Sequence, residues 1–316
     1  MITGINGFVG THLTRYLQSV MPFAELHGTI FNGKPENLID KVNYHQLDLK
    51  DTDRVNRLIR EAQPDLIFHL AAYAFVPDSF VDPWQTLENN MKSQLNLFEA
   101  CRLCDIQPKI FITSSATVYG SVQPDEIPLT ENAPLRPSNP YALSKIVQET
   151  MALQYQITYG WHVVCARLFN HIGPGQNANF VAPAFAQQIA QIEVGTQEPV
   201  IRVGDLSDKR DFIDVRDAVR AYKLILENGA SGEIYNIASG RSYRIQFILD
   251  HLIRHSSHKN IRVEVDKSLL RSTSTPILQG DYTKLHKATG WSPEIPIEQT
   301  LEDILNDARQ RIRKNE

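Results

Sequence analysis

Tyr141 and Lys145 stand four residues apart in the run Tyr-Ala-Leu-Ser-Lys, within a segment that the sequence predicts to be helical. Residues at positions i and i+4 lie on the same face of a helix, so these two side chains are expected to be neighbours. A free phenol, with a pKa of about 10, exchanges protons poorly at neutral pH, and a nearby ammonium group lowers that pKa. The pair is therefore a candidate for general acid–base catalysis.

Hydroxyl groups gather upstream of this pair, in the run Thr-Ser-Ser-Ala-Thr over residues 113–117. The run closes a predicted strand, in a position that suits the binding of a carbonyl oxygen. A Tyr-x-x-x-Lys pattern alone occurs in many ordinary helices. Its place after a glycine-rich loop and a serine-rich strand end argues against a chance match.

Three glycines near the N-terminus, Gly4, Gly7 and Gly10, follow one another at a spacing of three. Glycines in this pattern permit a tight turn, the close approach of a pyrophosphate to bare backbone, and close packing of a helix on a strand. A predicted helix follows at once, and its positive end favours phosphate. A simple glycine turn is the alternative interpretation, and the helix favours the phosphate-binding one.

The segment after the second predicted strand bears on the choice of dinucleotide. Proteins that bind NAD usually place an Asp or Glu there, for the ribose 2′-hydroxyl. Residues 28–34 read Gly-Thr-Ile-Phe-Asn-Gly-Lys, with no carboxylate and one lysine. We therefore favour NADP(H), with Asn32 or Lys34 beside the 2′-phosphate, and keep NAD(H) as the alternative. On the opposing interpretation, Lys34 is an ordinary solvated lysine.

Short apolar runs alternate with helical stretches through the first half of the chain. The predicted strands are residues 25–30, 43–47, 66–70, 110–113 and 162–168, and the predicted helices are residues 8–20, 52–62, 84–104 and 141–159. Each strand is short and bounded by polar or turn residues, as buried parallel strands tend to be. The alternation predicts a Rossmann-type α/β fold with a doubly wound parallel sheet.

After about residue 170 the pattern changes. A Gly-Pro-Gly break at residues 173–175 precedes a predicted helix at 182–195, a strand at 199–203, a helix at 215–228, a strand at 233–238 and a final amphipathic helix from about residue 301. We expect an NADP-binding Rossmann domain of residues 1–168 plus about 212–238. A smaller α/β substrate domain of about 169–211 and 239–316 is interleaved with it.

The composition argues against several other classes of protein. The 316 residues carry 32 Lys and Arg against 36 Asp and Glu, a formal net charge of −4, so no basic field exists to hold nucleic acid. No apolar run reaches the roughly 18 residues that suggest a membrane span. Three cysteines cannot form a disulfide framework, and no signal peptide is recognisable, so we expect a cytoplasmic protein.

Other residues whose side chains can react or bind a metal ion are interpreted as structural. Cys101 and Cys104 form a C-x-x-C pattern inside a predicted helix, with no second pair to complete a zinc or redox site. The ten histidines show no ligand spacing, and we expect no metal site. Of these histidines, His69 and His171 flank other motifs and are expected to be structural.

Only Met1, Ile2 and Thr3 precede the first glycine of the loop. A first strand normally has several residues before such a loop, and a central strand lends its whole length to the sheet. We therefore expect the natural start of the protein to lie a few codons upstream.

Together these motifs resemble the extended short-chain dehydrogenase/reductase family, in its nucleotide-sugar branch, over essentially the whole chain. The matching stretches are residues 3–10, 48–49, 69–72, 90, 114–120, 139–145 and 167–170. The resemblance implies that Ser115 acts in catalysis with Tyr141 and Lys145, with Thr117 as the second candidate for the hydroxyl. It also implies a set of cofactor-binding residues: Gly4, Asn6, Gly7, Phe8, Val9, Gly10, Asp48, Leu49, Leu70, Ala71, Ala72, Asn90, Tyr141 and Lys145.

Within this branch the second half is most similar to reductases of GDP-4-keto-6-deoxy-mannose. The matches lie at residues 173–176, 180–193, 203–206, 210–217, 278–281 and 289–291. The likeness implies NADPH-dependent reduction of the C4 ketone of such a GDP-sugar, giving a GDP-6-deoxyhexose such as GDP-D-rhamnose. Candidate substrate-binding residues are Asn170, Val181, Arg202, Arg210 and Arg271, the arginines because guanidinium groups suit a diphosphate. Ordinary ion pairs are the alternative for these arginines.

Three other functions are kept as alternatives. An NAD-dependent nucleotide-sugar 4-epimerase shares the Ser-Ala-Thr-Val-Tyr-Gly run. A GDP-mannose 4,6-dehydratase has a carboxylate beside the catalytic hydroxyl, where this chain has Ala116 and Thr117. A non-catalytic nucleotide-binding relative would have lost Tyr141 or Lys145, and both are present. Members of the family commonly pair through a four-helix bundle, so we expect a homodimer through the helices around 84–104 and 141–159.

Overall fold

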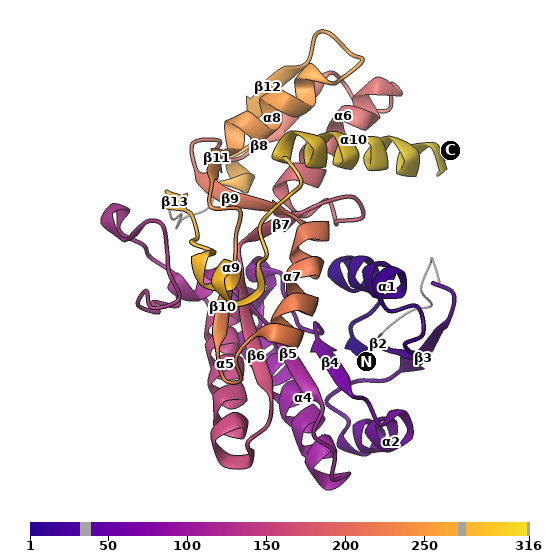
Figure 1. Ribbon diagram of the computed structural model, residues 1–316. Helices are drawn as coiled ribbons and strands as arrows, with labels where there is room; N and C mark the ends of the chain where they lie inside the picture. The colour runs from indigo at the N-terminus through magenta and orange to yellow at the C-terminus, as the bar shows by residue number, and fades with distance from the viewer. Residues whose placement is uncertain (32–38, 271–275, 315–316) are drawn as a thin grey trace.

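The computed structural model describes residues 1–31, 39–270 and 276–314. Its main element is a sheet of seven parallel strands in the order β10-β6-β5-β4-β1-β2-β3 (Figure 1). The strands are β1 (Ile2–Thr3), β2 (Leu26–Ile30), β3 (Val42–Gln46), β4 (Leu66–His69), β5 (Lys109–Ser115), β6 (Val163–Leu168) and β10 (Ile234–Ile237). The prediction of a doubly wound, Rossmann-type sheet is confirmed.

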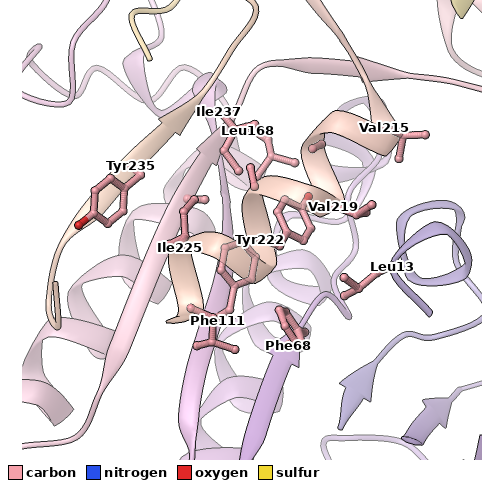
Figure 2. Packing of buried hydrophobic residues seen from close by; sticks show 14 of the residues in the cluster. Leu13, Phe68, Phe111, Leu168, Val215, Val219, Tyr222, Ile225, Tyr235 and Ile237 are labelled. Atoms are coloured by element: carbon pink, nitrogen blue, oxygen red, sulfur yellow. The ribbon is translucent and has the colours of Figure 1, made fainter. Parts of the chain in front are cut away.

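Helices cover both faces of this sheet. One face carries α2 (Thr52–Ala62), α4 (Pro83–Leu103) and α5 (Pro140–Tyr159), and the other carries α1 (Phe8–Val20) and α7 (Val215–Asn228). Successive residues of a strand point to opposite faces, so Ile110 and Ile112 of β5 pack against the first set and Phe111 against the second. Figure 2 shows the second set, where Tyr222 of α7 stacks on Phe111 with ring centroids 4.4 Å apart.

Local sequence fixes both ends of α5, which carries Tyr141 and Lys145. Asn139 precedes the helix and accepts a hydrogen bond at Oδ1 from the N–H of Ala142 at 2.8 Å, while a proline fills the first helical position. Gly160 ends the helix at a φ of 70°, a left-handed conformation that costs glycine little. These caps set Tyr141 in the first turn of α5.

The remaining elements form a smaller lobe, drawn above the sheet in Figure 1. Its helices α6 (Val181–Glu193), α8 (Ile245–Arg254) and α10 (Ile297–Lys314) share one apolar cluster. A small sheet is built on β9 (Lys209–Asp214), which pairs with β7 (Asn170–Ile172), β11 (Ser242–Arg244) and β13 (Ile277–Leu278), and β8 (Val200–Val203) pairs with β12 (Arg262–Val265). Two short helices complete the fold, α3 (Val76–Val81) before α4 and α9 (Thr283–Thr289) against α7. Among the described residues, no helix combines the length and apolar character needed to cross a membrane.

Several elements of this lobe differ from the expectation, and the short strands β7 and β11 were not predicted. β9 was not predicted because its charged residues do not look like those of a buried strand. Its Asp211 can be buried because it accepts hydrogen bonds from the backbone N–H groups of Ser239, Gly240 and Gly280. α8 was not predicted, although four buried apolar residues repeat along it at helical spacing. α10 begins at Ile297 rather than at about residue 301.

β9 continues directly into α7. Asp214 is the last residue of the strand and Val215 the first of the helix. Asp214 accepts a hydrogen bond at Oδ1 from the N–H of Arg216 at 2.7 Å, and the hydroxyl of Thr300 in α10 donates to Oδ2 at 2.7 Å. A strand of the smaller lobe and a helix of the larger one thus share one segment.

β1 has only two residues, yet it lies between β2 and β4. The amino group of Met1 donates to the carbonyl oxygen of Leu66 at 2.6 Å, and the N–H of Phe68 donates to the carbonyl oxygen of Met1 at 2.9 Å. Burial lowers the pKa of this amino group to about 5. The short strand is thus held by both of its neighbours.

Candidate active site

The glycine loop joins β1 to α1. Gly4 has a φ of +68°, which favours glycine, and its carbonyl oxygen accepts a hydrogen bond from the N–H of Gly7 at 3.0 Å. A Cβ on Gly10 would lie 2.5 Å from that same oxygen, so a larger residue does not fit there. Among the described residues no side chain caps the N-terminus of α1. The loop therefore presents bare backbone at a positive helix end.

Thr3 and His69 fix the glycine loop to the end of β4. The Thr3 hydroxyl oxygen accepts hydrogen bonds from the N–H groups of Leu70 and Ala71 at 3.0 and 3.1 Å, and it lies 3.0 Å from Nδ1 of His69. A Cβ on Gly4 would meet the Cα of Ala71 at 3.1 Å. The structure thus brings Leu70 and Ala71, followed by the half-buried Ala72, beside the loop. Sequence analysis had assigned Thr3 no role.

Asp48 and Leu49 follow the end of β3, two strands from the loop. Asp48 is half-buried and accepts a hydrogen bond at Oδ1 from the N–H of Lys50 at 2.8 Å. Leu49 is buried, and its carbonyl oxygen accepts a hydrogen bond from the amide of Asn96 at 2.9 Å. The predicted 2′-phosphate residues, Asn32 and Lys34, lie outside the described residues.

Asn90 of α4 is buried, and its amide is engaged by the protein itself. Its Oδ1 accepts from the N–H of Tyr73 at 2.8 Å, and its Nδ2 donates to the carbonyl oxygen of Tyr73 at 3.2 Å and to the hydroxyl of Ser144 at 2.9 Å. Ser144 donates in turn to the carbonyl oxygen of Tyr141 at 2.7 Å. Asn90 therefore ties the segment after β4 to the first turns of α5.

Ser115 and Tyr141 meet where β5 ends and α5 begins. Burial raises the pKa of Tyr141 to about 12, and a hydrogen bond with Ser115 opposes the rise. Thr117 donates from both its hydroxyl and its N–H to Oγ of Ser115, at 3.0 and 3.2 Å. The Ser115 hydroxyl is thus the one next to Tyr141, with Thr117 behind it.

Lys145 lies one turn after Tyr141, with Nζ 5.7 Å from the centroid of the phenol ring. Nζ donates to the carbonyl oxygen of Thr113 at 2.8 Å, and the hydroxyl of Thr113 donates to the carbonyl oxygen of His69 at 3.1 Å, which links the lysine to the end of β4. Burial lowers the pKa of Lys145 to about 8, and Glu149 opposes that change. The expectation that the pKa of Tyr141 is lowered was wrong for the chain alone, because burial of the phenol dominates.

The predicted substrate residues lie on four elements of the smaller lobe. Asn170 is exposed in β7, Val181 begins α6, and Arg202 is exposed in β8. Arg210 of β9 donates from its guanidinium to Asp208 at 2.7 Å, which is the ion pair kept as the alternative for these arginines. Arg271 lies outside the described residues.

A family profile described as GDP-mannose 4,6 dehydratase matches residues 1–304 of the chain. The chain belongs to the GDP-mannose 4,6 dehydratase family. One relative is the GDP-6-deoxy-D-mannose reductase of Pseudomonas aeruginosa, which is 37% identical over 314 residues, 99% of this chain and 98% of the relative. The expected membership of the nucleotide-sugar branch of the extended short-chain dehydrogenases/reductases is confirmed.

Two solved structures are similar over the whole chain. The structure of RMD from Pseudomonas aeruginosa complexed with NADPH is 36% identical, with a TM-score of 0.86 and coverage of 98% of both chains. The UDP-glucose 4-epimerase of Thermus thermophilus, in complex with NAD, is 28% identical, with a TM-score of 0.85 and coverage of 98% of both chains. Members of the GDP-mannose 4,6 dehydratase family therefore share this fold with epimerases.

A buried ion pair lies behind the Tyr–Lys pair in this member of the GDP-mannose 4,6 dehydratase family. Arg167 of β6 donates to both carboxylate oxygens of Glu149 at 2.9 and 2.8 Å, and both side chains are 5% exposed. The hydroxyl of Ser114 donates to Glu149 at 2.5 Å. Sequence analysis missed Glu149, although it follows Tyr141 and Lys145 at the same spacing of four along α5.

The expectation that the histidines have no ligand spacing was wrong. His251 and His255 stand four residues apart at the end of α8, and the structure brings them to Glu302 of α10, with one possible ligand atom of each residue within 4.8 Å of the others. The C-x-x-C pattern lies at the end of α4, where Cys101 is buried and Cys104 is half-buried.

Proposed function

We propose that the protein uses NADPH to reduce the C4 ketone of a GDP-4-keto-6-deoxy-mannose-type sugar and forms a GDP-6-deoxyhexose such as GDP-D-rhamnose. One structural observation carries the proposal: Ser115, Tyr141 and Lys145 meet at the end of β5, and hydrogen bonds through Thr113 and His69 connect them to the glycine loop. The likeness to GDP-6-deoxy-D-mannose reductase supports the choice of substrate and reaction.

The described residues fit a dinucleotide. A Cβ on Gly10 would lie 2.5 Å from the carbonyl oxygen of Gly4, and Cβ atoms on Gly4 and Gly7 would make tight contacts of 3.1 and 3.2 Å. The turn therefore presents bare backbone to a pyrophosphate. NADPH, when bound, supplies the hydride that C4 of the sugar receives. The residues that we assign to holding it are Gly4, Asn6, Gly7, Phe8, Val9 and Gly10 at the pyrophosphate, Asp48 and Leu49 at the adenine, Leu70, Ala71 and Ala72 beside the ribose, and Tyr141 and Lys145 near the reacting end. The engaged amide of Asn90 makes it a residue that positions these segments.

Tyr141 is the proton donor in this mechanism. Its pKa of about 12 keeps the phenol protonated at neutral pH, which is the state needed to protonate the oxygen at C4. Ser115 hydrogen-bonds the same oxygen and orients it. Lys145 has a pKa of about 8 and is therefore largely charged at neutral pH. One of its N–H groups is held by the carbonyl of Thr113, and the others would hold the cofactor ribose.

Reduction is favoured over dehydration by the residues that follow Ser115. Elimination of water needs an acid–base group beside the catalytic hydroxyl, and Ala116 and Thr117 occupy that position at the start of a short 3-10 helix (Ala116–Tyr119). Reduction is favoured over epimerisation by the likeness to the reductase over 99% of the chain.

We assign the cofactor to residues 1–168 and about 212–238, and the sugar nucleotide to about 169–211 and 239–316. Helix α7 and strand β10 support this division because they pack with the seven-stranded sheet, although they follow β9 of the smaller lobe. Asn170, Val181, Arg202, Arg210 and Arg271 are the proposed substrate residues.

A cytoplasmic location is also proposed, and the three unpaired cysteines support a reducing compartment.

A homodimer through α4 and α5 completes the proposal. The two helices pack against each other and leave large apolar side chains in solvent. These side chains are Leu95 and Leu103 on α4, with exposures of 42% and 61%, and Leu143, Leu153 and Ile157 on α5, with exposures of 43%, 44% and 71%. A second copy of the same surface covers such a stripe as a four-helix bundle. Light scattering on Ile157→Glu checks this, because a charge there should yield a monomer, and a wild-type monomer contradicts it.

The proposed reaction is tested with GDP-mannose, a separate 4,6-dehydratase and NADPH. We expect NADP⁺ release in equal amount to the deoxysugar formed, and nuclear magnetic resonance identifies the configuration at C4. Running the reaction without the separate dehydratase is the control. Conversion of GDP-mannose in that control identifies a dehydratase, and C4 inversion with tightly bound NAD and no net oxidation identifies an epimerase; either result overturns the proposal.

A further inference from the structure

Three side chains of the smaller lobe, those of His251, His255 and Glu302, come together between the end of α8 and α10. Figure 1 shows these two helices in the smaller lobe. Nε2 of His255 lies 3.4 Å from Oε1 of Glu302, and Nε2 of His251 lies 3.8 Å from the same oxygen. The two imidazole rings stack with centroids 4.4 Å apart. None of these residues takes part in the proposed reaction, so this cluster is independent of it.

The tautomer of His255 is fixed by the backbone. Its Nδ1 lies 2.9 Å from the carbonyl oxygen of His251, and because a carbonyl only accepts, Nδ1 carries the proton. In the neutral ring, Nε2 is then a bare lone pair that faces the carboxylate of Glu302. Two electron-rich atoms at 3.4 Å repel each other unless a positive charge lies between them. The guanidinium of Arg309 also holds the carbonyl oxygen of His255 at 2.8 Å, which fixes the backbone at this point.

His251 adds a buried atom that needs a partner. The residue is 6% exposed, and its Nε2 has no hydrogen-bond partner among the described residues. Protonating both rings would place two positive charges in stacked contact. One divalent cation satisfies both Nε2 atoms and the carboxylate together.

We propose that His251, His255 and Glu302 bind one divalent transition metal ion, and that zinc is the ion that fits them best. Imidazole nitrogen and carboxylate oxygen are ordinary zinc ligands. Two donors at about 2.1 Å from one tetrahedral ion lie roughly 3.4 Å apart, which is close to the two distances measured to Glu302. The carbonyl oxygen of His251 accepts a hydrogen bond from Nδ1 of His255, and such a carbonyl is a usual second partner of a zinc-binding histidine.

The fourth position of such an ion faces solvent. The side chains of His255 and Glu302 are 37% and 42% exposed, so water reaches the cluster and completes the coordination. Glu298, one turn earlier in α10, adds negative charge near His251. The ion joins α8 to α10, so its stabilisation of the folded lobe rises with the logarithm of its free concentration once that concentration exceeds the Kd.

Calorimetric titration of the tag-free, chelator-treated protein with zinc chloride tests the site. We expect one equivalent to bind, and cobalt chloride to give the visible absorption of a tetrahedral Co²⁺ ion. His255→Ala and Glu302→Gln change partly exposed side chains, so the fold is retained, and each should weaken zinc binding at least about tenfold. The matched control is His258→Ala, because that histidine lies three residues after His255, past the end of α8, and outside the cluster.

Thermal unfolding with and without zinc gives a second readout. The midpoint should rise with zinc in the wild type and in His258→Ala, and the rise should be lost in Glu302→Gln. A wild type that binds no zinc overturns the proposal. It is equally overturned if His255→Ala and Glu302→Gln bind zinc as the wild type does, because the ion then lies elsewhere.

Discussion

Asn90 donates from Nδ2 to the hydroxyl of Ser144 at 2.9 Å, and Ser144 donates to the carbonyl oxygen of Tyr141. The first of these hydrogen bonds connects α4 to α5, and the second continues within α5 to its first turn. The same amide holds both backbone groups of Tyr73, so the loop after β4 is positioned by the residue that positions Tyr141. The first turn of α5, which carries the proposed proton donor Tyr141, is therefore positioned by a buried amide on a different helix.

Asn90→Ala should destabilise the protein and lower kcat. The change leaves the N–H of Tyr73 without its acceptor, and an unsatisfied buried group costs about 1–3 kcal/mol. Urea unfolding measures the loss, and steady-state kinetics measures kcat. Lys92→Ala, at an exposed position of the same helix, is the control and should change stability by less than about 0.5 kcal/mol. Equal stability of the two variants contradicts the positioning role.

Tyr141→Phe should lower kcat by about 10²–10⁴-fold, because the proton donor is removed. The dissociation constant for NADPH should change little, since the ring remains in place. Fluorescence titration separates binding from turnover. Tyr159→Phe, at the other end of α5, controls for loss of a tyrosine hydroxyl. Unchanged turnover in Tyr141→Phe removes this residue from the mechanism.

Ser115→Ala should cost more activity than Thr117→Ala. Ser115 is hydrogen-bonded with Tyr141, whereas Thr117 reaches the site only through Ser115. We expect a loss of about 10²-fold for Ser115→Ala. For Thr117→Ala, the loss of one supporting hydrogen bond predicts less than about tenfold. The reverse order in kcat/KM makes Thr117 the catalytic hydroxyl.

Lys145 should lose its proton near pH 8, because burial lowers its pKa from 10.5 to about 8. Turnover that needs the ammonium falls as the pH rises through this value. Between pH 8 and 10.5 the unfolded chain holds more protons at this site, so the lysine's contribution to stability rises with pH. Carbon resonances of labelled lysines should show one signal titrating near pH 8. That signal should be missing in Lys145→Arg; its persistence there contradicts the assignment.

Glu149→Gln should lower the free energy of unfolding by about 3–5 kcal/mol, because it leaves the buried Arg167 without its counter-charge. Denaturant unfolding measures the change. The exposed pair Lys223–Glu227 provides the control, and Glu227→Gln should cost at most about 0.5 kcal/mol. Equal costs for the two substitutions would show that the burial of Glu149 has no energetic consequence.

Much of the larger lobe could be predicted because its signals are local. Predicted helices 8–20, 52–62 and 215–228 have the bounds of α1, α2 and α7, since apolar spacing and caps such as Asp51 mark their ends. The Tyr141–Lys145 pair follows from spacing along one helix. The sequence could therefore predict that these two side chains are neighbours, and their catalytic role stays a prediction.

The unpredicted features depend on residues distant in the chain. β9 contains a buried Asp211 because loops at residues 239–240 and 280 supply its hydrogen bonds. The pKa of Tyr141 is set by burial, which no local pattern shows. The two histidines of α8 have a visible spacing, but Glu302 reaches them only through the packing of α10.

The unbroken passage from β9 into α7 has a mechanical consequence. A hinge needs a few residues whose backbone dihedrals are free to change, and at this crossing Asp214 belongs to the strand and Val215 to the helix. The smaller lobe is thus joined to α7 with no loop between them. Because no loop separates the two elements, we expect a tilt of β9 to move α7, which stacks Tyr222 on Phe111 of β5. The smaller lobe is in this way coupled to β5, whose last residue is Ser115.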